Sequence, residues 1–342
     1  PPMREPAFWY RPASWKSHLL RPLAALYGAV AAHRLERKGL SAGIPVFCVG
    51  NYHGGGAGKT PTVLALAALL RELGETPVVL SRGYRGRLRG PVRVDSSRHE
   101  AGDVGDEPLM LSHDVPVVVS RDRADGVALA KSLAATVIVM DDGFQNPAVA
   151  KDASLIVIDA KRGVGNAQVM PAGPLRAPLA AQVARTDALI VIGEGRAAEE
   201  VAAAVSGQGK PVLRARFIPD QASLSVLRGR RTLAFAGIRD PERFFATLRE
   251  SGVDVARTRV FADHHPLTQD EMGSLLVDAE REGLTLVTTE KDMARLRNAG
   301  GVPERLREIV PFKVRLAFED AAALKAFTAA QLFGARDIRR TM

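Results

Sequence analysis

The chain has 342 residues, 46% of them apolar and 25% charged, a composition that excludes a disordered or fibrous protein and allows two globular domains. Its 47 basic and 38 acidic residues give a formal net charge of +9, which favours an anionic partner, whether nucleic acid, membrane or nucleotide. The single cysteine, Cys48, excludes an intrachain disulfide and a zinc site built from cysteines, and it favours a reducing cytoplasm.

The first 40 residues are basic and aromatic, with seven Lys or Arg residues against two acidic ones and both tryptophans of the chain. Apolar residues at helical spacing predict an amphipathic helix over 22–38, with Pro22 in its first turn. This stripe is Leu23, Leu26, Tyr27, Val30 and Ala31. Such a segment suits the interface of an anionic membrane, and it equally fits a helix packed on the domain core with a solvated basic end. No apolar run reaches the roughly 18 residues of a spanning helix and no secretory signal is recognisable, so we expect a protein that neither spans a membrane nor is exported.

From residue 41 the chain alternates short β-branched runs with helical stretches. The predicted strands are 46–49, 77–80, 117–120, 137–140, 155–158 and 189–192, and 62–73 is predicted to be the helix after the first strand. Strands separated by helices indicate an α/β fold with a mostly parallel sheet covered on both faces. In such sheets ligands bind at the carboxyl ends of the strands.

A second, smaller α/β unit is predicted after a Gly-punctuated stretch that ends near residue 210. Its expected strands are 212–217, 232–236, 285–288 and 311–318, and a terminal helix follows. We therefore divide the chain into an N-terminal segment (1–40), a nucleotide-binding domain (41–210) and a C-terminal domain (211–342).

The stretch GNYHGGGAGKTP, residues 50–61, lies between the first predicted strand and its helix. A Gly-rich loop turns backbone N–H groups toward phosphate oxygens at a helix N-terminus, whose dipole favours an anion. Lys59 is then expected to reach the β- and γ-phosphates of a nucleotide, and Thr60 to ligate magnesium. His53 replaces the first glycine of the pattern G-x-x-x-x-G-K-[ST], but the glycines after it supply the necessary freedom. The loop residues expected at the phosphates are Gly54, Gly55, Gly56, Ala57 and Gly58.

Two further segments carry adjacent carboxylates. In VIVMDDGFQN an apolar strand ends at Asp141 and Asp142, where P-loop enzymes place a carboxylate beside magnesium. Asp-Gly is also common turn chemistry, and we favour the metal role because of the Gly-Lys-Thr upstream. In GDEP, Asp106 and Glu107 suit either a base and a metal ligand or the acidic first turn of a helix.

A histidine pair lies in FADHHPLTQDE, residues 261–271. Thr268 and Glu271 form a capping box, so His264 and His265 are expected in a loop directly before a helix of the second domain. The pair by itself does not indicate catalysis.

The order of the motifs resembles that of the tetraacyldisaccharide 4′-kinases, which phosphorylate the lipid A precursor of Gram-negative bacteria. The motifs are FWY (8–10), LYG (26–28), PVFCVGN (45–51), GGGAGKTP (54–61), SRGY (81–84), GDEP (105–108), DDGFQN (141–146), PAGPLR (171–176), AGIRDPERFF (236–245), FADHH (261–265) and TTEKD (288–292). The resemblance covers nearly the whole chain. It implies a P-loop fold with a smaller C-terminal domain joined by a strand-containing hinge, and it implies ATP and Mg²⁺.

The resemblance also implies roles for individual residues. Asp106 and His264, which directly follows Asp263, would form a base dyad for the sugar hydroxyl. Lys59 and Thr60 would hold phosphate and magnesium, and Arg176 would approach phosphate. The residues implied around the metal are Glu107, Asp141 and Asp142. The chain departs from the usual family pattern at His53, at Ala57 in place of a hydroxyl residue, and at Ala177 in place of a glutamate.

We therefore expect ATP-dependent phosphorylation of the 4′-hydroxyl of the tetraacyl glucosamine disaccharide 1-phosphate, by a peripheral protein on the cytoplasmic face of the inner membrane. Residues 1–40 are where we expect membrane and lipid contact. We expect no nucleic-acid binding, because aromatic and basic residues do not alternate along a sheet, and no obligate protein partner. The alternatives are a P-loop kinase for a soluble metabolite and a nucleotide switch without turnover. A GTPase switch is disfavoured because the guanine signature Asn-Lys-x-Asp is absent.

Overall fold

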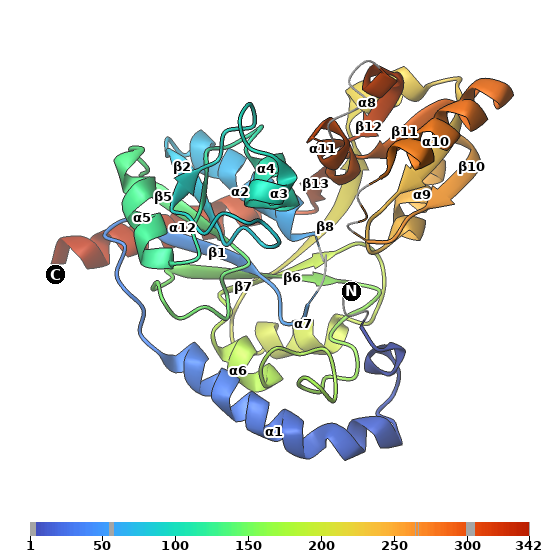
Figure 1. Ribbon diagram of the computed structural model, residues 1–342. Helices are drawn as coiled ribbons and strands as arrows, with labels where there is room; N and C mark the ends of the chain where they lie inside the picture. Colours follow the sequence, from blue (N-terminus) through green and yellow to red (C-terminus); the bar gives the residue numbers. More distant parts are fainter. Residues whose placement is uncertain (1–4, 55–57, 264, 266, 299–304, 342) are drawn as a thin grey trace.

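A nine-stranded sheet forms the centre of the computed structural model, which describes residues 5–54, 58–263, 265, 267–298 and 305–341 (Figure 1). In spatial order the strands are β13 (Val314–Phe318), β8 (Val212–Pro219), β7 (Ala188–Ile192), β6 (Ala153–Asp159), β1 (Val46–Gly50), β5 (Val137–Asp141), β2 (Pro77–Ser81), β4 (Val117–Val119) and β3 (Val92–Arg93). Neighbours pair in parallel except at the two edges, where β13 and β3 are antiparallel. The six strands predicted between 46 and 192 are confirmed.

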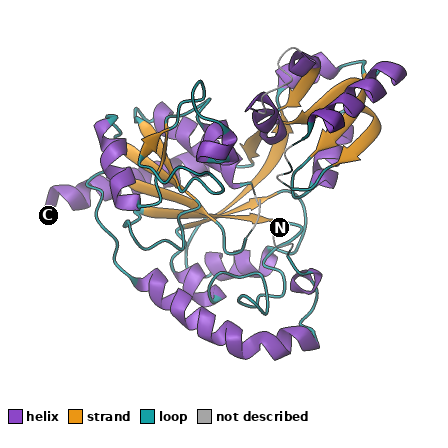
Figure 2. Cartoon of the chain, viewed as in Figure 1, coloured by secondary structure: helices purple, strands orange, loops and turns teal. Residues whose placement is uncertain are grey.

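Helices cover both faces of this sheet (Figure 2). One face packs against α2 (Lys59–Glu72), α4 (Asp106–Leu111) and α12 (Ala321–Thr341), and the other against α5 (Arg123–Ser132), α6 (Leu179–Ala184) and α7 (Glu199–Ser206); the short α3 (Ala101–Val104) precedes α4. Every residue of the central strands β1, β5 and β6 is buried, as expected of a parallel sheet covered on both sides. The predicted fold class is confirmed.

The strand order reverses direction at β1. From β1 the chain crosses to β2, β3 and β4 on one side, returns to β5 beside β1, and then continues to β6, β7 and β8 on the other side. Loops leaving β1 and its neighbours therefore diverge at the carboxyl edge, which opens a crevice there. The Gly-rich stretch begins at the end of β1, so the topology places it in this crevice.

A second sheet of four parallel strands forms the smaller domain, at the upper right of Figure 1. Its order is β10 (Asp254–Val260), β9 (Arg231–Ala236), β11 (Thr285–Thr289) and β12 (Ile309–Phe312). Its helices are α8 (Gln221–Leu227), α9 (Pro241–Glu250), α10 (Gln269–Glu282), α11 (Glu290–Asn298) and the 3-10 turn η2 (Arg305–Glu308). Separate apolar clusters under α10 and α9 give this domain its own core.

The boundary expected near residue 210 does not separate the two sheets. β8 continues the large sheet by pairing with β7, and β13 returns to pair with β8. Leu324 and Leu332 of α12 are buried in the core of the large sheet. The single strand predicted over 311–318 is wrong, because the chain crosses between the domains at Lys313 and forms β12 in one sheet and β13 in the other.

The N-terminal segment forms the 3-10 turn η1 (Ala7–Tyr10) and the helix α1 (Trp15–Glu36), which packs against α6 along the lower edge of Figure 1. The helix starts earlier than predicted, because the N–H of His18 already bonds the carbonyl of Ser14 at 3.0 Å, and Pro22 lies inside it. Small residues face the protein: Ser17, Ala24 and Gly28 are its buried positions. Six of its large apolar side chains, Trp15, Leu19, Leu23, Leu26, Tyr27 and Val30, are exposed. No helix within the described ranges is long and apolar enough to cross a membrane.

Candidate active site

The loop between β1 and α2 is shaped by Gly58, which caps the helix in the left-handed conformation at φ 98°. A Cβ at this position would lie 2.6 Å from Cδ1 of Ile192, so only glycine fits. Lys59 and Thr60 follow in the first turn of α2, and both side chains are buried. The expected phosphate contacts Gly55, Gly56 and Ala57 lie outside the described residues.

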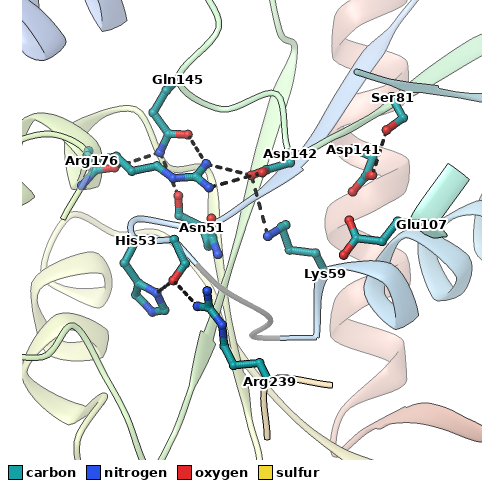
Figure 3. Close-up of polar contacts among 12 residues, drawn as sticks. Asn51, His53, Lys59, Ser81, Glu107, Asp141, Asp142, Gln145, Arg176 and Arg239 are labelled. Carbon is teal, nitrogen blue, oxygen red and sulfur yellow. Dashed lines mark hydrogen bonds and ion pairs between the residues drawn. The ribbon is translucent and has the colours of Figure 1, made fainter. Parts of the chain in front are cut away.

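A cavity of about 790 Å³ opens at the carboxyl edge of the large sheet and extends to the smaller domain. The residues predicted from separate motifs meet on its wall, namely Gly54, Gly58, Lys59, Thr60, Asp106, Glu107, Asp141, Asp142 and Arg176. Figure 3 shows Lys59, Glu107, Asp141 and Asp142 converging on one space. The structure therefore brings together the described site residues that the sequence predicted.

Asp141 ends β5 with one carboxylate oxygen already engaged. Oγ of Ser81 donates to its Oδ2 at 3.2 Å, while Oδ1 is buried and has no hydrogen-bond partner among the described residues. Burial raises the pKa of Asp141, and the carboxylates of Glu107 and Asp142 raise it further. A buried oxygen of this kind is stabilised by a cation, so the residues present fit a bound metal ion.

Asp142 differs sharply from its neighbour because two cations contact it. Its Oδ1 lies 3.8 Å from Nζ of Lys59 and 2.9 Å from Nη1 of Arg176, and Oδ2 lies 3.3 Å from Nη2 of Arg176. Burial would raise the pKa of Asp142, but Lys59 and Arg176 outweigh it and lower the pKa to about 2. Asp142 is thus ionised and holds Arg176, which also donates to Oε1 of Gln145 at 3.0 Å.

No group of three or more His, Cys, Asp or Glu residues that could cage a metal occurs in the part of the chain that the structure describes. Magnesium that binds together with a nucleotide needs only one or two carboxylates, since phosphate oxygens and water complete its shell. Asp141 at the cavity wall meets that smaller requirement.

Asp106 and Glu107 form the first turn of α4, after Gly105 at φ 93°. The smaller domain contacts both: Nε of Arg295 donates to Oδ2 of Asp106 at 2.8 Å, and Nζ of Lys291 lies 3.3 Å from Oε1 of Glu107. Both partners come from α11, which begins inside the motif TTEKD: Lys291 belongs to the motif and Arg295 follows it. The sequence singled out that motif but indicated no role for Lys291 or Arg295.

The predicted base partner His264 lies outside the described residues. Its neighbour Asp263 lines the cavity. His265 is engaged elsewhere, because its Nε2 lies 2.9 Å from Oε2 of Glu271 and its ring stacks on Phe261. Thr268 and Glu271 form the predicted capping box of α10.

His53, the departure from the glycine pattern, is buried. Its Nδ1 lies 2.8 Å from the carbonyl oxygen of Gly54, and its backbone bridges to Leu175. The N–H of Arg176 donates to the carbonyl of Tyr52 at 2.9 Å. These contacts join the loop after β1 to the motif PAGPLR (171–176), and they fix the position of Arg176. Burial lowers the pKa of His53.

Comparison with known proteins decides the family. Residues 16–332 match the sequence family of the tetraacyldisaccharide-1-P 4′-kinases. The chain belongs to this family. The tetraacyldisaccharide 4′-kinase of Bradyrhizobium diazoefficiens is 67% identical over 98% of this chain and 99% of its own, and that of Nitrobacter winogradskyi is 65% identical over 95% and 96%.

A solved member of the family has the same fold. The crystal structure of LpxK from Aquifex aeolicus in complex with ATP matches 92% of this chain and 99% of its own, with a TM-score of 0.73 and 26% sequence identity. The resemblance inferred from the motifs is confirmed, and the chain is a kinase of this family with a P-loop fold.

Proposed function

We propose that the chain transfers the γ-phosphate of ATP to the 4′-hydroxyl of a tetraacyl glucosamine disaccharide 1-phosphate, the lipid A precursor. The observation that carries this is the convergence of Lys59, Thr60, Asp106 and Asp141 on one cavity, at the switch point of a P-loop sheet. The named activity of the relatives, and ATP bound to the Aquifex aeolicus protein, agree with it.

Magnesium bound with ATP would neutralise charge on the phosphate oxygens. Asp141 is the residue we assign to direct contact, because its buried Oδ1 has no partner among the described residues. Thr60 at the start of α2 and Glu107 across the cavity complete the assigned set. Asp142 contributes differently, since it holds Lys59 and Arg176 near the transferred phosphate.

The acceptor hydroxyl needs a base as it attacks phosphorus, and we assign Asp106 to this role with His264 as its partner. Arg295 orients Asp106 from the smaller domain through the 2.8 Å hydrogen bond. Lys59 and Arg176 would stabilise the charge that develops on the transferred group. The base and the P-loop thus belong to the large domain, whereas the groups that orient the base come from the small one.

The helix α1 is the surface we assign to the membrane, on the cytoplasmic face of the inner membrane. Leu19, Leu23 and Leu26 are 71%, 60% and 69% exposed, which is unusual for one continuous stripe of a soluble protein. Tyr27 and Arg34 from the same helix line the catalytic cavity. A lipid whose acyl chains stay in the bilayer could therefore reach the cavity along α1.

Transfer of labelled γ-phosphate from Mg²⁺-ATP to the acylated disaccharide 1-phosphate in mixed micelles tests the proposal. The native chain should phosphorylate this acceptor, and Asp106→Ala should lose activity by about 10²–10⁴-fold while still binding ATP. Asp337→Ala, which removes an exposed acid of α12, serves as the control and should keep full activity. ATP binding by a folded native protein that transfers nothing to this acceptor would contradict the proposed substrate.

A further inference from the structure

Two arginines on the cavity wall beside the P-loop have no part in the function proposed above. Arg162 follows β6 of the large sheet and Arg239 follows β9 of the small one, and both line the cavity. Nη1 of Arg239 donates to the carbonyl oxygen of Gly54 at 3.3 Å, a contact drawn in Figure 3. The pair therefore adjoins the phosphate loop and is built from both domains.

A single carboxylate, Glu5, holds both guanidinium groups. Nη2 of Arg162 donates to its Oε2 at 2.7 Å, and Nη1 of Arg239 donates to its Oε1 at 3.0 Å. The hydroxyl of Tyr10 also donates to Oε2, at 2.9 Å. The Glu5 side chain is only 13% exposed, and its Oε1 lies 3.6 Å from the place that a Cβ on Gly54 would occupy. Glu5 thus holds the Arg162 and Arg239 side chains in place.

The charges at this pair do not cancel. Two guanidinium groups share one carboxylate, whereas Arg243, another cavity residue from the small domain, has Asp159 as its own ion-pair partner. Arg162 and Arg239 keep 29% and 36% of their side chains exposed. Within the described structure their polar contacts use one nitrogen each, out of five N–H donors per guanidinium group.

We propose that Arg162 and Arg239 bind a terminal phosphate group in the cavity, and that Glu5 positions the two side chains for it. Guanidinium groups match the oxygens of a phosphate with paired hydrogen bonds, and a carboxylate behind them removes the freedom of long side chains before the ligand arrives. The Tyr10 ring, 4.4 Å from the Arg162 guanidinium carbon, adds a cation–π contact that restricts it further.

If the proposed function holds, the cavity receives two phosphate groups that these arginines could bind. One is the γ-phosphate of the nucleotide, and the other is the 1-phosphate of the acceptor. The inference rests on the proposed function to that extent. Because Arg239 comes from the small domain, either phosphate would bind both domains at once. The two sources are separated by equilibrium binding, without turnover.

The experiment measures dissociation constants of the full chain for four probes: the non-hydrolysable ATP analogue AMP-PNP, ADP, the acylated disaccharide 1-phosphate in detergent micelles, and the same lipid without its phosphate. The variants are Arg239→Ala and Glu5→Gln. Arg230→Ala, which removes an exposed arginine of the same domain, is the matched control. Thermal unfolding of each variant reports whether it is folded.

Arg239→Ala should weaken one probe by about 10-fold or more and leave unchanged its counterpart that lacks the phosphate in question, which is ADP for AMP-PNP and the dephosphorylated lipid for the 1-phosphorylated one. Loss confined to AMP-PNP identifies the γ-phosphate, and loss confined to the 1-phosphorylated lipid identifies the acceptor. Glu5→Gln should weaken the same probe by a smaller factor, which a purely structural role would not do selectively. Equal affinities of Arg239→Ala and Arg230→Ala for every probe would overturn the proposal.

Failure of the proposed function has a different signature. Suppose that the native chain binds AMP-PNP more tightly than ADP through Arg239 but transfers no phosphate to the lipid. The phosphate site is then supported, and only the proposed acceptor is wrong. Selective lipid binding through Arg239 without transfer likewise separates the two.

Discussion

At the residue scale, burial disfavours the charged form of His53. Its ordinary pKa is 6.5, and burial lowers it in the folded chain, so the unfolded chain takes up a proton at a higher pH than the folded one does. The free energy of unfolding should therefore fall as the pH drops below about 6.5. His53→Asn removes this titration, and the side-chain amide can still donate to the Gly54 carbonyl.

Urea unfolding at pH 7.5 and pH 5 measures the effect. We expect the native chain to lose more stability than His53→Asn between the two pH values, whereas His33→Asn, an exposed position in α1, should behave like the native chain. Parallel losses in the native chain and in His53→Asn would show that His53 is protonated equally in both states.

A site residue can be predicted from the sequence when its partners lie close to it along the chain or at predictable strand ends. Lys59, Thr60 and Asp141 belong to short motifs at strand ends, and the parallel topology then brings those ends together. Arg295 reaches Asp106 across 189 positions and Arg239 reaches Glu5 across 234. No local pattern announces such a contact, because it exists only once the second domain is placed against the first.

At the element scale, the start of α2 depends on one backbone conformation. Gly58→Ala would force a Cβ into the left-handed region, at a cost of about 1–2 kcal/mol, and would also push it against Ile192. We expect a lower melting temperature and a marked loss of nucleotide affinity. Gly74→Ala is the matched control, since Gly74 has φ +85° at the other end of α2 with no atom within 4 Å of the added Cβ. Gly74→Ala should lower stability and leave nucleotide affinity unchanged.

The exposed stripe of α1 predicts a second element-scale result. Replacing Leu19, Leu23 and Leu26 together with Gln should reduce binding to vesicles that contain anionic lipid, because apolar area no longer enters the bilayer. Unfolding should change little, as these side chains contact water in the isolated chain. The control replaces three exposed apolar residues elsewhere, Val226, Val277 and Ile338, with Gln. Equal vesicle binding by the two triple variants would argue against α1 as the membrane surface.

Element types were predictable because apolar periodicity is local, but two boundaries were not. Pro22 predicted the first turn of α1, but the helix already begins at Trp15, after the N-cap Ser14. Pro22 therefore lies inside the helix, seven residues after its start. The run PFKVRLAF has the pattern of one strand, and only pairing with two different sheets divides it at Lys313.

At the scale of the whole molecule, ion pairs between the domains differ in burial and so in strength. Arg295 is 9% exposed and bonds both Asp106 and Asp292, whereas Lys291 and Glu107 are 22% and 37% exposed. Arg295→Ala should destabilise the chain by about 3–5 kcal/mol, because buried carboxylates lose their cation. Lys291→Ala should cost about 1 kcal/mol or less.

Thermal unfolding of the two variants compares them directly. Arg295→Ala should also lower kcat of phosphate transfer through Asp106, with ATP affinity retained. Similar melting temperatures for both variants would mean that the contact between α4 and α11 is too hydrated to matter.

The antiparallel pairing of β13 with β8 determines where the small domain can be deleted from the chain. Pro219 and Val314 are partners in that pair, so the chain leaves the large sheet and re-enters it at adjacent points. Everything between them is an insertion, and a two-residue hairpin turn is long enough to replace it. A protein shortened in this way should still fold around the nine strands and bind nucleotide, while the arginines that reach across from the small domain would be gone.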